Sequence, residues 1–174
     1  MKQLTDNLLN LARGEMASIS LRRERLDLAR VAEEVAGRFR LQAEEKHVAL
    51  DLNIEQVPPV SGDPVKLSWV VSNLIGNALR YTPEGGRIEV MTGCAADIVR
   101  LEVADSGPGV APELRDYVFE RFAQYGDGAE KGSAGLGLTI VKDIVAAHSG
   151  RIFVTGNIPV GSRFVVQLPV SREA

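Results

Sequence analysis

Two asparagines, Asn73 and Asn77, lie four residues apart in a segment whose apolar residues recur at helical spacing over 63–82. They would share one face of that helix, about one turn apart. Asparagine is a poor helix-interior residue because its amide competes for backbone hydrogen bonds, so two of them among apolar residues indicate a polar role. An amide oxygen suits Mg²⁺, which often takes waters and substrate phosphates as its other ligands. Arg80 and Tyr81 follow near the same face, and a plain polar surface stripe is the alternative.

A second group of residues that could do chemistry is the glycine-rich run "GSAGLG", residues 132–137, which precedes another predicted helix. Free backbone N–H groups and the positive end of the helix dipole could face an anion there. The run is not a P-loop, because no Gly-Lys-Ser/Thr occurs in the sequence, and it does not follow a predicted strand as a dinucleotide motif does. Taken alone, it favours a plain hinge.

The third group is "DSGPG", which begins with Asp105 at the end of an apolar, strand-like run. A carboxylate at that place could accept a hydrogen bond from an exocyclic amino group such as that of adenine. Gly107 and Gly109 would let a flat ring lie against the backbone, because no Cβ intrudes. Taken alone, the segment is more typical of a structural turn.

The elements that must position these residues follow from periodicity. Besides the helix over 63–82, we expect helices in "LDLARVAEEVAGRFRLQAEEKHV" and "LGLTIVKDIVAAHSG", a short helix near "PELRDYVFERF", a loop at "EQVPPVSG", and strands at "ALDLNI", "RIEVMTG", "IVRLEVAD", "RIFVTGN" and "SRFVVQLP". Strands and helices are mixed without strict alternation, which predicts an α+β fold with helices layered on one face of a mixed sheet.

Composition narrows the class of protein. The net charge of the 174-residue chain is −3, which argues against a dedicated nucleic-acid binder with its basic face. A single cysteine, Cys94, cannot form an internal disulfide, and no apolar run is long enough for a membrane span. We expect a soluble, cytoplasmic domain.

The three groups take on a joint meaning when they are placed in chain order with two further segments. "NLIGNALRYTP", "DSGPGV", "VFERF", "AGLGLTIVKDIVAAHSG" and "GSRFVVQLP" resemble the N box, first glycine box, F box, second glycine box and last box of the ATP-binding catalytic domain of bacterial sensor histidine kinases. That family lies within the gyrase, Hsp90, histidine kinase and MutL superfamily. The resemblance covers about residues 26–170. It implies a two-layer α/β sandwich of the Bergerat ATP-binding type over 25–174.

The resemblance also implies roles for individual residues. Asn77 would bind Mg²⁺ with Asn73 beside it, Arg80 would meet the phosphates, Tyr81 would lie on the adenine side, and Asp105 would read the adenine amino group. The full set implied to bind Mg·ATP is Asn73, Asn77, Arg80, Tyr81, Asp105, Gly107, Gly109, Phe122, Lys131, Gly135, Leu136, Gly137, Leu138 and Ser162. Asn77 and Arg80 are the implied catalytic residues.

The segment between the F box and the second glycine box departs from the family pattern. Phe119 and Phe122 would anchor a lid over the nucleotide. Many members continue the F box as Phe-Tyr-Arg, whereas this chain has Ala123 and Gln124 after Phe122 and so lacks a cation near the γ-phosphate. Arg121 or Lys131 could replace that cation. A smaller departure is "SA", residues 133–134, where Gly-Thr is usual.

A sensor histidine kinase also needs an acceptor histidine on a dimerisation helix. Neither His47 nor His148 lies in an acceptor motif of the type His-Glu-x-x-x-Pro. Residues 1–24 resemble the end of the second dimerisation helix, with Leu4, Leu8 and Leu11 as its apolar stripe. We therefore expect a catalytic fragment, not self-phosphorylating, whose partners are the acceptor helix of a homodimeric kinase and a response regulator receiver domain. The parent protein could be anchored in the inner membrane.

Two other readings share the fold. An anti-sigma serine kinase would normally lack the N-terminal helical appendage and would need a different acceptor. A degenerate relative would bind nucleotide without catalysis; the intact Asn77 and Asp105 argue against it, and Gln124 argues slightly for it.

Overall fold

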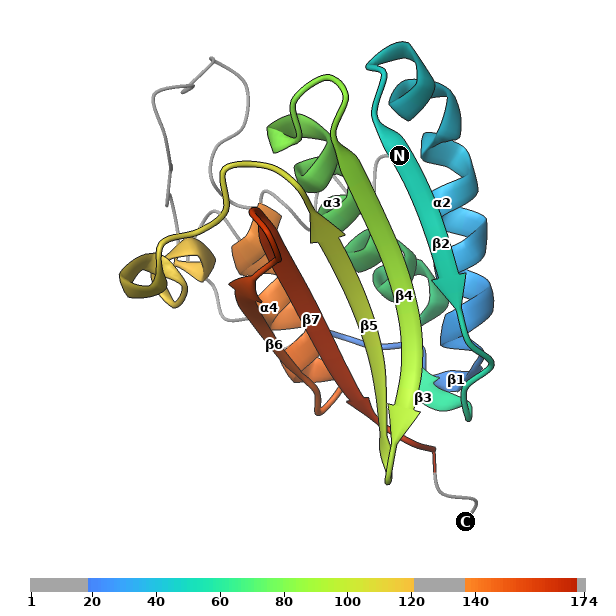
Figure 1. Cartoon of the computed structure of the whole chain (residues 1–174). Coiled ribbons are helices and arrows are strands. Elements are labelled where there is room, and N and C mark those ends of the chain that lie inside the picture. The colour runs from blue at the N-terminus through green and yellow to red at the C-terminus, as the bar shows by residue number, and fades with distance from the viewer. Residues whose placement is uncertain (1–18, 121–136, 172–174) are drawn as a thin grey trace.

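The computed structural model describes residues 19–120 and 137–171, which form a layer of strands and a layer of helices (Figure 1). The main sheet has five strands, in the spatial order β2 (Ala49–Ile54), β4 (Arg87–Ala95), β5 (Ile98–Asp105), β7 (Ser162–Pro169) and β6 (Arg151–Gly156). The pair β2 and β4 is parallel and the other pairs are antiparallel. The helices α2 (Leu28–Glu45), α3 (Pro64–Tyr81) and α4 (Gly137–Ala147) lie on one face of this sheet. The predicted α+β fold with a mixed sheet is confirmed.

The helices α2 and α3 each begin directly after an aspartate that caps the helix. The Asp27 side chain accepts a hydrogen bond from the backbone N–H of Arg30 at the start of α2. At the start of α3, Asp63 Oδ1 accepts from the N–H groups of Val65 and Lys66, both at 3.1 Å, and proline occupies the first helical turn. The helix α3 ends at Tyr81, just before the threonine and proline that follow it.

The core fills the space between the sheet and the helices. Along β4, Ile88, Val90 and Thr92 are buried and alternate with half-buried or exposed side chains on the open face of the sheet. The largest fully buried apolar side chains come from α2, β3 (Val60–Gly62), α3, β4, β5 and β7: Leu28, Val60, Leu67, Val70, Val71, Leu74, Ile75, Ile88, Val90, Leu101 and Leu168. The helix α3, which carries five of these residues, is therefore rigidly placed under the sheet.

Two local expectations were wrong. The predicted loop at 55–62 contains a short strand, β3 (Val60–Gly62), which pairs antiparallel with β1 (Glu24–Leu26) in a separate two-stranded sheet. The short helix expected in 112–122 is replaced, as far as the chain is described, by two 3₁₀ turns, η1 (Pro112–Leu114) and η2 (Tyr117–Phe119). Tight 3₁₀ turns rarely run longer than three or four residues, and neither turn here has a side-chain cap.

The turn η2 is fixed to the domain through Phe119. This side chain is buried, and its ring meets the ring of Phe164 on β7 edge to face at a centroid distance of 6.2 Å. None of the helices in the described ranges is long and apolar enough to cross a membrane.

Candidate functional site

Asp105 is a buried carboxylate at the end of β5, with 3% of its surface exposed. Its Oδ1 accepts hydrogen bonds from the N–H groups of Gly107 at 2.8 Å and Ser162 at 3.3 Å, and its Oδ2 accepts from Ser162 Oγ at 2.9 Å. An ionised carboxylate offers about four acceptor positions. Among the described residues, three donors reach the carboxylate of Asp105, so one position on Oδ2 is left for a further donor.

The glycines beside Asp105 serve the protein's own packing. A Cβ on Gly107 would lie 2.9 Å from both Asp105 Oδ1 and the backbone oxygen of Tyr81. Gly109 has φ +79°, and a Cβ there would lie 2.8 Å from the backbone oxygen of Gly161. From the sequence, these glycines are expected to let a flat ring lie against the backbone, and that expectation stays a prediction. In the structure, protein atoms fill the space that a Cβ would take on either glycine, so the loop can fold back onto the carboxylate.

Asn73 and Asn77 lie on one face of α3, as predicted, and both are half-buried. Asn77 Nδ2 lies 3.4 Å from Asn73 Oδ1, at the long end of hydrogen-bond distance. Gly137, the first residue of α4, packs against the Asn73 amide so closely that a Cβ on it would lie 2.7 Å from Asn73 Nδ2. The amide pair therefore meets the first turn of α4.

Arg80 and Tyr81 lie at the C-terminal end of α3, and both side chains are exposed. The Arg80 guanidinium lies 5.6 Å from the centroid of the Tyr81 ring, within the range of a cation–π contact. Their backbone is held by Lys46, whose Nζ donates to the carbonyl oxygens of Leu79 at 2.5 Å and Arg80 at 3.2 Å. The end of α3 is therefore tied to α2.

The first turn of α4 holds a buried hydroxyl that has no hydrogen-bond partner among the described residues. Thr139 Oγ1 is enclosed, and the described part of the chain supplies no hydrogen bond to it. Leu138, its neighbour, is half-buried against the core. A buried polar atom left unpaired costs about 1–3 kcal/mol, so such atoms often mark a place where a ligand or water completes the structure.

These groups converge at one end of the molecule. Gly107 touches the backbone of Tyr81, which joins the end of β5 to the end of α3, and Gly137 touches Asn73, which joins the start of α4 to the middle of α3. The C-terminal ends of α3 and β5 and the N-terminal end of α4 lie at the same end of the fold (Figure 1). The site residues Phe122, Lys131, Gly135 and Leu136, and the expected lid, lie outside the described residues.

Sequence reasoning missed residues on the turn between β6 and β7. Asn157 Nδ2 donates to the backbone oxygen of Asp105 at 2.9 Å, and Gly161, with φ +120°, lies against the same peptide. The sequence "NIPVG" at 157–161 is a turn signal between two strands. Nothing in a single sequence says that this turn folds against residue 105.

At the opposite end of α4, His148 links the end of this helix to the start of α3. Its Nδ1 donates to the backbone oxygen of Ile144 at 2.7 Å, and its Nε2 accepts from the N–H of Asp63 at 3.0 Å. Burial lowers the pKa of this imidazole, and the positive charge of Arg23 acts in the same direction. The sequence argument identified His148 as a structural residue, and its burial and hydrogen bonds confirm this.

The segment before β1 is fixed at the same place. The Arg22 N–H donates to Asp63 Oδ2 at 3.0 Å, and Arg23 Nη2 donates to the backbone oxygen of Ala147 at 2.6 Å. Burial alone would raise the pKa of Asp63, but the hydrogen bonds from the N–H groups of Arg22, Lys66 and Val65 outweigh it and lower that pKa. The chain therefore enters the domain at the start of α3 and the end of α4.

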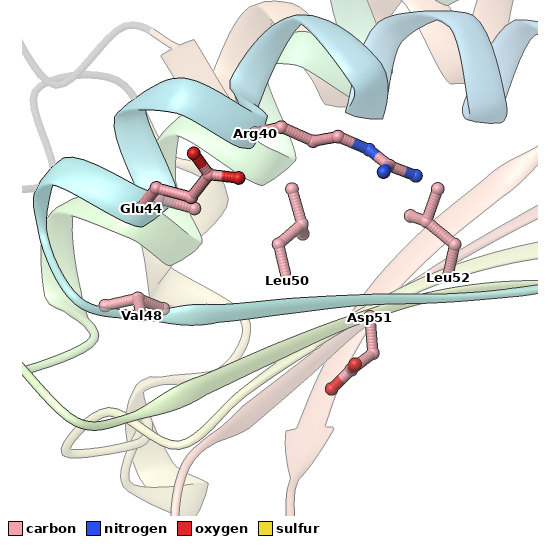
Figure 2. A pocket seen from close by; sticks show the side chains of 7 residues that line it. Arg40, Glu44, Val48, Leu50, Asp51 and Leu52 are labelled. Atoms are coloured by element: carbon pink, nitrogen blue, oxygen red, sulfur yellow. The ribbon is translucent and has the colours of Figure 1, made fainter.

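A groove of about 270 Å³ between α2 and β2 lies apart from these groups (Figure 2). Figure 2 shows Leu50 and Leu52 of β2 pointing toward α2, where Arg40 and Glu44 line the other side, whereas Asp51 points away from α2. None of the residues predicted from the sequence to bind a nucleotide lines it.

The fold and the convergence of a buried carboxylate, an amide pair and a glycine-started helix define an α/β sandwich of the ATPase class. The chain belongs to the family described as "Histidine kinase-, DNA gyrase B-, and HSP90-like ATPase", whose model matches residues 62–172. It is similar to the alginate biosynthesis sensor protein KinB of Pseudomonas aeruginosa, with 34% identity over 96% of this chain and 28% of that protein. It is also similar to the signal transduction histidine-protein kinase BaeS of Escherichia coli K12, with 32% identity over 99% of this chain and 38% of that protein. The chain thus spans about a third of the length of these relatives.

Solved structures of histidine kinases share the fold. Full-length ShkA in complex with AMPPNP superposes with a TM-score of 0.83 at 32% identity, over 99% of this chain and 36% of that chain. The mycobacterial sensor histidine kinase MprB gives a TM-score of 0.73 at 30% identity, over 87% of this chain and 99% of that chain. The predicted family and fold are confirmed.

Proposed function

We propose that this chain binds Mg·ATP and donates the γ-phosphoryl group to a histidine on a separate dimerisation helix, as the catalytic part of a two-component sensor histidine kinase. The family match and the kinase relatives support the proposal. The ShkA structure, which is similar over nearly the whole chain, was solved with the ATP analogue AMPPNP. The observation that carries the proposal furthest is the buried carboxylate of Asp105 with one acceptor position to spare.

Asp105 is the proposed adenine-selecting residue. Its Oδ1 already has two donors and its Oδ2 has one, so the remaining acceptor can pair with the amino group of adenine. A base that carries a carbonyl oxygen in place of this amino group would put one hydrogen-bond acceptor against another, the Asp105 carboxylate. Ser162 supports the carboxylate through both its N–H and its Oγ, and this contact explains its place in the site.

The amide pair on α3 is the proposed Mg²⁺ site, with Asn77 as the ligand and Asn73 beside it. Among the described residues, no group of three or more His, Cys, Asp or Glu side chains could hold a metal ion. A single amide oxygen fits Mg²⁺ when waters and nucleotide phosphates complete its octahedron. When bound, the ion neutralises charge on the phosphates during transfer.

The N-terminal end of α4 is the proposed phosphate side of the site. Gly137 begins the helix beside Asn73, so the backbone N–H groups of its first turn lie next to the proposed metal ligand. The unpaired Thr139 Oγ1 in that turn could donate to a phosphate or to a bound water. Arg80, exposed at the end of α3, is the proposed cation toward the phosphates, and we propose that Gly135, Leu136 and Lys131 act on the same side.

The acceptor is proposed to lie on another helix, because neither histidine of this chain suits the role. His148 is buried and uses both ring nitrogens in hydrogen bonds, and it follows α4, whose 11 residues put it about 16 Å from the start of that helix. His47, exposed in the turn after α2, is followed by "VAL" and so lacks the acceptor motif. A response regulator receiver domain would then take the phosphoryl group from the acceptor helix.

Titration of the chain with ATP and GTP in the presence and absence of Mg²⁺ tests the nucleotide assignment. We expect Mg²⁺-dependent binding with a preference for ATP, and we expect Asp105→Asn to weaken ATP binding by about 1–3 kcal/mol because a buried donor of the base loses its acceptor. The control is Asp51→Asn, which alters a carboxylate on the edge strand β2 that pairs with Arg87 of β4. Equal ATP affinity in the Asp105 variant and the wild type would refute the assignment.

A further inference from the structure

The turn between β6 and β7 contacts the backbone of Asp105, whereas Ser162 contacts its side chain. Asn157 Nδ2 donates to the backbone oxygen of Asp105 at 2.9 Å, and the N–H of Asn157 donates to the backbone oxygen of Gly161 at 3.0 Å. The first bond crosses from the turn to β5, and the second closes the turn itself. The carbonyl at the end of β5 is therefore fixed by a side chain that lies beyond the sheet's regular ladder.

The close approach of the two backbones makes this bond possible. Gly161 has φ +120°, and a Cβ on it would overlap the carbonyl group of Asp105. A side chain at this position would push the turn away from β5. The absence of one brings the amide of Asn157 and the carbonyl of Asp105 within hydrogen-bond reach.

The orientation of the Asn157 amide is set by a second contact. Arg163 Nη2 donates to Asn157 Oδ1 at 3.4 Å, which leaves Nδ2 to face the Asp105 carbonyl. Arg163 is held in turn by Glu102, with Nη1 and Oε2 at 2.7 Å and with both side chains mostly buried. Glu102 and Asp105 lie on the same strand, so the contacts close a ring from β5 through β7 and the turn and back to β5.

We propose that Asn157 is a positioning residue for base selection: it holds the peptide of Asp105 so that the free acceptor of the carboxylate keeps its direction toward the base. This inference rests on the proposed role of Asp105. Ser162 and Gly107 donate to the carboxylate and so hold the end of the Asp105 side chain. The hydrogen bond from Asn157 to the Asp105 carbonyl instead holds the backbone to which that side chain is attached. A hydrogen bond weakens steeply as its angle bends, so a small rotation at residue 105 reduces discrimination between bases.

The test compares the affinities of ATP and inosine triphosphate, which carries a carbonyl where adenine has its amino group. Asn157→Asp keeps the size of the side chain and its partner Arg163 but removes the donor to Asp105, and Asn157→Ala removes both contacts. We expect both variants to lower the ratio of the Kd for inosine triphosphate to the Kd for ATP by about three- to tenfold. Asn53→Asp, on the outer strand β2, is the matched control and should leave the ratio unchanged.

The ratio separates positioning from plain stability. Both constants come from one protein preparation, so a loss of folded protein cancels. If the Asn157 variants weaken both nucleotides by the same factor, Asn157 has a merely structural role and the inference is wrong. If Asp105→Asn lowers the ratio but the Asn157 variants do not, the inference alone fails. If Asp105→Asn leaves the ratio unchanged, the proposed base recognition fails as well.

Discussion

The Nε2 atom of His148, at the end of α4, accepts a hydrogen bond of 3.0 Å from the backbone N–H of Asp63, the capping residue of α3. The bond requires a neutral imidazole, because the other ring nitrogen already donates to Ile144. Two helices that carry opposite parts of the proposed site are thus joined at their far ends by an imidazole whose pKa is lowered by burial.

This relationship predicts that the domain loses stability in mild acid. The pKa of His148 is lowered in the fold, mainly by burial, so the unfolded chain binds the proton more readily. The stabilisation is present above the unfolded pKa of about 6.5 and is lost as the pH falls from there toward the folded pKa. Thermal unfolding followed between pH 8 and about pH 5 should show the midpoint falling in this window.

The control for the pH prediction is the second histidine. His47→Asn changes an exposed residue with φ 54°, a conformation that asparagine tolerates, and should keep the pH dependence. His148→Gln should reduce it. A wild-type midpoint that stays constant across the window would contradict the assigned role of His148.

Asp63 should contribute to stability in two separable ways, as the cap of α3 and as the anchor of Arg22. Asp63→Ala removes both contacts and should lower the free energy of unfolding by about 1–2 kcal/mol. Asp63→Ser keeps a capping oxygen but is too short to keep the second bond, so its loss should be smaller. Urea denaturation of both variants measures the difference: equal losses would mean that the capping bonds contribute nothing, and no loss in Asp63→Ser would mean that the Arg22 contact contributes nothing.

Glycine-to-alanine changes should have opposite signs at two positions. Gly161→Ala places a Cβ against the Asp105 carbonyl at φ +120° and should destabilise the domain by about 2 kcal/mol or more. Gly37→Ala, in the exposed middle of α2 with open space around it, should stabilise by about 0.5–1 kcal/mol. Denaturation midpoints compare the two, and a tolerated Gly161→Ala would contradict the described approach of the turn to β5.

Asn77 should be needed for productive use of the metal. Asn77→Ala removes the proposed ligand, and phosphoryl transfer depends more on metal and positioning than on covalent help from the protein. We expect ATP binding that no longer responds to Mg²⁺ and a large loss of transfer to an added acceptor domain. Asn53→Ala is the matched control. Wild-type transfer by the Asn77 variant would show that this residue is not the metal ligand.

The sequence was sufficient where a local rule determines the structure. Asp63 followed by proline predicts the start of α3, and Pro83 and Gly85 predict its end; the observed helix spans Pro64–Tyr81. The strands β1 and β3 were missed because three residues carry too little periodicity to detect, and their pairing joins segments about 36 residues apart.

The site was predictable as a set of chemical groups but not as a geometry. Asp105 stands out as an acid after an apolar run, whereas its partner Asn157 lies 52 residues away in a segment that reads as an ordinary turn. The sequence shows that Gly107 and Gly109 lack a Cβ. Whether a ligand or the protein itself fills the space beside them depends on tertiary contacts, which the sequence does not show.

The central claim is tested most directly by incubating the chain with γ-labelled ATP and Mg²⁺, alone and with a separately supplied dimerisation-helix domain that carries an acceptor histidine. The transferred group needs an acceptor nitrogen close to and in line with the γ-phosphate, and His148 is buried and hydrogen-bonded at both ring nitrogens. We predict acid-labile label on the added domain and none on the 174-residue chain. Label on the isolated chain that disappears when His148 or His47 is replaced, or no label on any cognate acceptor domain, would contradict the account.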